Sequence, residues 1–144
     1  MTPAAEKRAW QVLLALVLIL PFTAAIAGVV KGPAFLGRPP VIPTDLDSHF
    51  RYVSGIFLAM LVFYVSCIPD MEHKTQRLRL LGARTVAGGL ARLFLLASVG
   101  VPSIGHQVGL CIELGIAPAM ILWQARIAAR FERNPREAAT PGEP

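Results

Sequence analysis

The sequence predicts an all-α membrane protein, a bundle of four transmembrane helices without a soluble domain. Hydrophobic residues make up 54% of the 144 residues and charged residues only 16%, which is less charge than a soluble domain of this size carries. The apolar residues gather in four blocks, each close to the ~20 residues that cross a bilayer as a helix. Because backbone groups in lipid must be paired within the structure, the blocks are expected to be helical.

The blocks lie near Trp10–Val30, Leu46–Ile68, Ala83–Val101 and Gly105–Gln124. The first also resembles a secretory signal, since Lys7 and Arg8 precede an apolar run that ends in an A-x-A site at Ala27. We favour a retained helix because the apolar stretch continues through Val30. Cleavage of Met1–Ala27, which would leave three helices, stays open as the alternative.

The connecting segments are short and each has its own composition. Lys31–Thr44 is rich in proline and glycine and is expected to be an external loop, because proline interrupts regular helices. Thr44–Asp47 predicts the start of the second helix and Pro69 its end. Met71–Leu81 is polar and basic, and we expect it to lie at the membrane interface as an amphipathic turn.

Small residues mark the third and fourth blocks. Gly88 and Gly89 interrupt the third, and Gly105 and Gly109 form a GxxxG match in the fourth. Residues of this size let helix backbones approach closely in lipid. We expect the two blocks to pack as a tight hairpin across Pro102–Ser103, with a homodimer contact as the alternative.

Basic residues are distributed unevenly along this chain, whose formal net charge is +5. With four crossings, ten of the fourteen fall on one side, and the positive-inside rule then puts both termini in the cytoplasm. This distribution favours membrane lipids as partners and argues against nucleic acid. Residues 1–130 are expected to form the transmembrane domain, and residues 131–144 a disordered cytoplasmic tail.

Two opposite charges lie within the apolar blocks. Arg92 and Glu113 stand about 11 and 10 residues from a turn near Ser103, so they are expected at nearly equal depth, where they can pair across helices. An ionised group at this depth is costly and needs a partner (for Arg, roughly 2.5 to 3.5 kcal/mol at a helix centre). The pair is therefore the first candidate for a functional site.

Further polar residues are expected nearer the outer surface. Asp47 and Arg51 are four apart and share one helix face, and His49 and His106 lie on the same side. The predicted intramembrane polar network consists of Asp47, His49, Arg51, Arg92, His106 and Glu113. It has two interpretations: a buried charge network that sets helix register, or a polar cavity that opens outward and holds a ligand or relays protons.

The sequence gives little sign of other chemistry. It has no Walker loop, dinucleotide fingerprint, Gly-x-Ser-x-Gly elbow or haem attachment motif, and no pair of residues at metal-ligand spacing. No cofactor and no metal are therefore expected. Cys67 and Cys111 are expected at different depths, too far apart for a disulfide.

Three polar motifs together resemble a known group of proteins. They are Asp47–Tyr52 (DSHFRY), Gly88–Arg92 (GGLAR), and the Gly100–Pro102 turn followed by Glu113. Over roughly Val12–Arg130, the chain is similar to small bacterial four-helix membrane proteins catalogued only as a domain of unknown function. This resemblance implies a bacterial inner-membrane protein and carries no catalytic residues. A fainter likeness of architecture connects it to DoxX-type and sterol-isomerase-like bundles, by analogy of fold alone.

Three functional hypotheses follow. The first and favoured one is an accessory or structural membrane protein, which could form a homo-oligomer or have a membrane-protein partner. The second is a module that binds or transports a small amphiphile, lipid or proton through an outward polar cavity. The third is a membrane-embedded lipid-modifying enzyme that uses Glu113 or Asp47 as an acid or base; catalysis is the least favoured.

Overall fold

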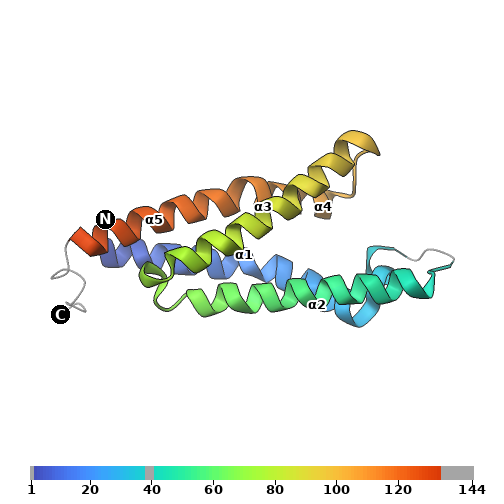
Figure 1. The fold of residues 1–144 in the computed structure, drawn as a ribbon, viewed down its shortest axis with the longest axis horizontal. Helices are drawn as coiled ribbons and strands as arrows, with labels where there is room; N and C mark the ends of the chain where they lie inside the picture. The colour runs from blue at the N-terminus through green and yellow to red at the C-terminus, as the bar shows by residue number, and fades with distance from the viewer. Residues whose placement is uncertain (1, 38–40, 134–144) are drawn as a thin grey trace. The chain divides into compact units, whose positions relative to one another are not determined.

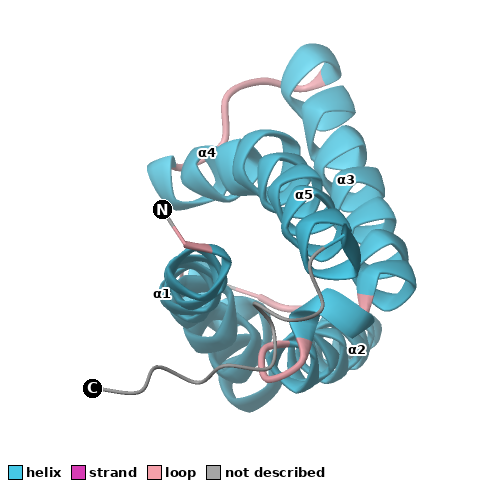
Figure 2. Ribbon diagram, turned by 90° about the vertical axis from the view of Figure 1, so that its left-hand side faces the viewer, coloured by secondary structure: helices cyan, strands magenta, loops and turns pink. Residues whose placement is uncertain are grey.

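The computed structural model describes residues 2–37 and 41–133, which hold helices and turns but no strand (Figure 2). The helical segments between Ile104 and Arg133 follow one another without a break, so residues 2–37 and 41–133 contain four long helical stretches. Each stretch is long and apolar enough to cross a membrane, which confirms the all-helical fold. The elements are α1 (Pro3–Lys31), the 3₁₀ turn η1 (Gly32–Leu36), α2 (Thr44–Cys67), the 3₁₀ turn η2 (Met71–His73), α3 (Thr75–Ser98), α4 (Ile104–Cys111), the π-helical turn η3 (Ile112–Ile116) and α5 (Ala117–Arg133).

The third helix begins earlier than the apolar block predicts. α3 starts at Thr75, so Thr75–Leu81, the larger part of the segment expected to be an interfacial turn, forms its first two turns, whereas Met71–His73 is the turn η2. Leu78, Leu81 and Gly82 are buried there, and a Cβ added to Gly82 would overlap the side chain of Ile121 on α5. The helix extends because its apolar residues recur at helical spacing and pack on α5, although polar residues lie between them.

The last helix is longer than predicted. α5 continues to Arg133, so residues 131–133, expected to begin a disordered tail, are helical. Residues 134–144, the rest of the predicted tail, lie outside the described residues.

The chain divides into two compact units. One consists of Ala15–Ser66, and the other of Met1–Leu14 together with Cys67–Pro144. The Ala15–Ser66 unit is a helical hairpin made of the second part of α1, η1 and α2 (Figure 1). Its helices approach closely where Gly28 faces Ser54, since an added Cβ on Gly28 would overlap that side chain. The rings of Phe35 and Phe50 are also close, with centroids 5.9 Å apart.

The second unit has α3 packed along η3 and α5, with η2 against α5 (Figure 1). Its core includes Met71, Leu78 and Ile127, each at most 1% exposed. Gln124 is fully buried among them and donates hydrogen bonds to the carbonyl of Met71 (2.7 Å) and to the hydroxyl of Thr75 (2.9 Å). The amide thus joins α5 to η2 and to the first turn of α3.

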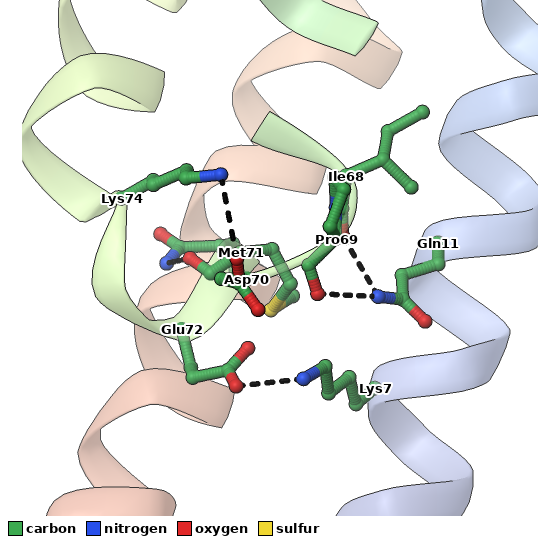
Figure 3. Close-up of polar contacts among 9 residues, drawn as sticks. Lys7, Gln11, Ile68, Pro69, Asp70, Met71, Glu72 and Lys74 are labelled. Atoms are coloured by element: carbon green, nitrogen blue, oxygen red, sulfur yellow. Dashed lines mark hydrogen bonds and ion pairs between the residues drawn. The ribbon is translucent and has the colours of Figure 1, made fainter. Parts of the chain in front are cut away.

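The first turns of α1 bind the connector between α2 and α3 (Figure 3). The Lys7 ammonium lies 2.6 Å from the carboxylate of Glu72. Gln11, one turn further on, donates from Nε2 to the carbonyls of Ile68 (2.7 Å) and Pro69 (3.1 Å). These carbonyls follow the end of α2, where no further helical turn supplies a donor.

The same turns also bind α5. The indole of Trp10, only 1% exposed, donates to the carbonyl of Met120 at 2.8 Å. The carboxylate of Glu6 accepts a hydrogen bond from the indole of Trp123 at 2.9 Å and pairs with Arg130. The Glu6–Gln11 segment, in which sequence reasoning saw only the start of the first span and its basic flank, therefore joins α1 to the connector and to α5.

Replacing Gln124 by Leu should lower the free energy of unfolding by about 1 to 3 kcal/mol, because the buried carbonyl of Met71 loses its donor. The measurement is equilibrium unfolding in detergent. Gln76→Leu makes the same chemical change at an exposed position of α3 and should change the stability by less than about 0.5 kcal/mol. Equal losses in the two variants would contradict this role for Gln124.

Candidate functional site

Arg92 and Glu113 lie together within the second unit. Nε of Arg92, on α3, is 3.5 Å from Oε2 of Glu113, in the π-helical turn η3. The carboxylate side chain is 14% exposed and the guanidinium side chain 42% exposed. Oε2 is buried and has no hydrogen-bond partner among the described residues. The pair is thus an ion pair without an aligned hydrogen bond, and it is buried on the carboxylate side only.

Two glycines make room for the pair. A Cβ added to Gly109 would lie 2.8 Å from Nη1 of Arg92, and one added to Gly89 would lie 2.9 Å from the Cβ of Glu113. At Gly89 the Cβ of Glu113 and the side chain of Leu114 leave no space for a side chain, whereas a Cβ at Gly109 would displace only the guanidinium end of Arg92. The two glycines of the GxxxG match therefore differ. The guanidinium of Arg92 lies against Gly109, whereas an added Cβ on Gly105 would meet nothing within 4 Å.

The π-helical turn sets the direction of Glu113. The amide of Ala117 donates to the carbonyl of Ile112, five residues back instead of four. Pro118 follows, and its missing N–H cannot pair with the carbonyl of Leu114 as an α-helix requires. One extra residue in a turn rotates the preceding helix by about 100° relative to the regular path. Sequence reasoning missed this turn, although Pro118 was the available signal.

His106 is not brought to this pair. His106 lies at the start of α4, where its Nδ1 is 2.9 Å from the hydroxyl of Ser103. His49 is exposed on α2, in the other unit. Gln107, beside His106, donates to the carbonyl of Pro102 at 2.8 Å. His106 and Gln107 therefore close the turn between α3 and α4.

Asp47 and Arg51 form the second charged pair, within the Ala15–Ser66 unit. Arg51 donates from Nε to Oδ1 of Asp47 (3.0 Å) and from Nη2 to Oδ2 (3.3 Å). Its Nη1 donates to the carbonyls of Val29 (2.7 Å) and Val30 (2.8 Å), in the last turn of α1. Carbonyls at a helix end lack intrahelical donors and attract positive charge. Arg51 thus caps α1 from the side of α2.

The residue after α1 is adapted to this contact. Gly32 has a φ of +59°, a left-handed conformation typical of the position that follows a helix. An added Cβ on Gly32 would overlap Oδ1 of Asp47. The end of α1 therefore needs glycine for its backbone conformation and for the close approach of the carboxylate.

The described residues contain no group of three or more His, Cys, Asp or Glu side chains arranged to hold a metal ion. Cys67 is buried and Cys111 exposed, and both are free thiols. The charged residues of the predicted network are arranged as two ion pairs, and Arg51 also caps α1.

A family model described as "Domain of unknown function (DUF4345)" matches residues 9–124. The chain belongs to this family. The match includes both charged pairs, Trp10 and Gln124, and it confirms the resemblance inferred from the three polar motifs. No curated protein and no solved structure matches the chain.

Deleting Ile116 from the DUF4345 chain should restore regular α-helical register in η3 and turn Glu113 away from Arg92. The unfolding free energy should fall by about 3 to 5 kcal/mol, as when one member of a buried ion pair is lost. Adding Glu113→Gln to the deletion variant should then lower the unfolding free energy by little more, because the ion pair is already lost. Unfolding in detergent measures both effects.

The control for this deletion is Ile116→Ala, which keeps the residue count and the π-helical turn. Ile116 is 39% exposed, so the substitution should cost about 1 kcal/mol, and Glu113→Gln should retain its full effect in that background. If Glu113→Gln lowers the unfolding free energy as much in the deletion variant as in the unaltered chain, the turn does not direct Glu113 toward Arg92.

Proposed function

We propose that the protein is an integral, multi-pass protein of the bacterial inner membrane with both termini in the cytoplasm. The observation that carries the proposal is the apolar surface of its four long helices. On α1, Val12, Leu16 and Ile19 are 58 to 59% exposed, and comparable side chains are exposed on α2, α3 and α5. Apolar surface this extensive is unsuited to water and is what lipid-facing helices present.

The distribution of charge supports the orientation. Basic residues gather where α1 and α3 begin and where α5 ends, at positions that four crossings would put on one side. Positive charge near span ends is retained in the cytoplasm. The resemblance to bacterial four-helix proteins supports the choice of membrane.

We propose an accessory or structural role for the protein. Arg51 is engaged by one carboxylate and two helix-end carbonyls, which leaves little of its hydrogen-bonding capacity for chemistry. Glu113 faces Arg92, and two glycines accommodate the pair. Both charged pairs connect helices within their own units, as expected of groups that set helix register.

One observation favours the alternative, a site for a small amphiphile, lipid or proton. The guanidinium of Arg92 is partly exposed, and Oε2 of Glu113 has no hydrogen-bond partner among the described residues. Ionisable groups at membrane depth commonly mark ligand or proton pathways. No comparable observation favours the lipid-modifying enzyme, which stays a hypothesis from the sequence.

The topology predicts which introduced cysteines react with a membrane-impermeant maleimide. In a Cys111→Ser background, where the remaining Cys67 is buried, Val41→Cys should be labelled in intact cells. Ala4→Cys and Gln76→Cys should be labelled only after permeabilisation. The reverse pattern would contradict the orientation, and loss of residue 4 from the mature chain would indicate a cleaved signal.

Replacing Arg92 and Glu113 with Met, singly and together, distinguishes the two roles. Each single change should lower the unfolding free energy by about 3 to 5 kcal/mol, because it leaves one charge unpaired. The double change should recover most of the folded yield. We expect growth of the host to recover with it, as a structural pair requires.

The matched control is Arg79→Met, which removes an exposed arginine from the same helix and should leave the folded yield unchanged. Recovery of yield without recovery of growth would contradict the structural role and support the ligand or proton site.

A further inference from the structure

One face of α3 is exposed along almost four turns. We call it the Arg77–Ala91 face. Its members recur at helical spacing, so they share one side of the helix. The buried residues Leu78, Gly82 and Gly89 lie on the other side of the helix, toward η3 and α5, and the buried Leu81 lies at the border of the face. The members of the face are Arg77, Leu80, Arg84, Ala87, Gly88 and Ala91.

The arginines of this face have no counter-charge within the part of the chain that the structure describes. Three carboxylates at the same end of the unit are already paired: Glu6 with Arg130, Glu72 with Lys7, and Asp70 with Lys74. Among the described residues, no carboxylate lies within ion-pair distance of Arg77 or Arg84. A guanidinium fork matches phosphate geometry and binds it through two parallel hydrogen bonds. A phosphate group is therefore complementary to this face in charge and geometry.

The rest of the face suits a hydrocarbon chain. Leu80 is 62% exposed between the two arginines. Further along α3 the face consists of the small residues Ala87, Gly88 and Ala91. A Cβ added to Gly88 would meet nothing within 4 Å. Small side chains leave a shallow groove beside the helix, into which an alkyl chain can pack closely.

We propose that the Arg77–Ala91 face binds an anionic phospholipid of the bilayer, with its phosphate at Arg77 and Arg84 and one acyl chain along Ala87, Gly88 and Ala91. The proposal rests on the proposed membrane placement, in which the start of α3 lies in the cytoplasmic leaflet. The order of groups along the helix, cationic and then apolar and small, follows the order of groups in a phospholipid from headgroup to tail. A soluble anion would use the arginines but not the groove.

Native mass spectrometry of the full chain in a neutral detergent tests the proposal. Dioleoylphosphatidylglycerol is titrated as the probe, with dioleoylphosphatidylcholine for comparison. Each arginine near a charged surface contributes about 1 kcal/mol, or about fivefold in affinity. The R77Q/R84Q variant should therefore bind phosphatidylglycerol about 25-fold more weakly and phosphatidylcholine unchanged.

Matched controls separate this face from general attraction to positive charge. Arg79 is an exposed arginine of the same helix on a different side, so R79Q should weaken binding less than about twofold. Gly88→Leu fills the groove and should weaken binding. Gly105→Leu makes the same change at another open glycine and should not.

Several results would overturn the proposal. Equal losses in R79Q and R77Q/R84Q would indicate attraction to charge alone, and full affinity in Gly88→Leu would exclude the groove. A shift from dimer to monomer in Gly88→Leu would assign the face to a second copy of the chain. Circular dichroism and gel filtration verify folding of each variant. Failure of the membrane placement itself would appear separately, in the maleimide labelling of Ala4→Cys, Val41→Cys and Gln76→Cys.

Discussion

A polar group that is removed from water is stabilised by a partner inside the protein, and the described structure depends on the buried donors that have one, although Oε1 of Gln124 and Oε2 of Glu72 and Glu113 have no hydrogen-bond partner among the described residues. Gln124 is fully buried because Met71 and Thr75 supply acceptors for its amide hydrogens. Trp10 is buried with its indole N–H on the carbonyl of Met120. Arg51 donates hydrogen bonds to the carbonyls of Val29 and Val30 at the end of α1. Each of these bonds joins elements far apart in sequence, so these polar groups gain their partners only when the helices pack.

Glycine supplies the space in which charged side chains meet. Gly89 and Gly109 admit Glu113 and Arg92, and Gly32 admits Asp47 at the end of α1. At these positions the missing side chain matters more than closeness of helix backbones. The π-helical turn adds a rotational adjustment beside Pro118, so that the carboxylate of Glu113 faces α3. Local deviations of this kind concentrate at functional sites, which makes this pair the first position to test.

Part of the candidate site followed from counting residues. Arg92 and Glu113 are nearly equidistant from the turn at Ser103, and a hairpin of two helices brings such positions to one level. The pairing of Asp47 with Arg51 followed from their spacing of four. The positions of His106 and Gln107 did not follow, because shared depth says nothing about direction: both side chains turn toward Pro102 and Ser103. The contacts of Glu6, Lys7 and Gln11 were also unpredictable, since polar residues at the end of a span can remain in water.

The sequence by itself determined the helical class, the number of long apolar helices, the end of α2 before Pro69 and the charges that need partners. These properties depend on composition and on periodicity along the chain, which local physics controls. Only the tertiary structure decided which carbonyls Arg51, Gln11 and Trp10 bind, which glycines are filled by neighbouring side chains, and that α3 begins at Thr75. Those outcomes depend on how distant segments pack, where gains from burial outweigh local preference.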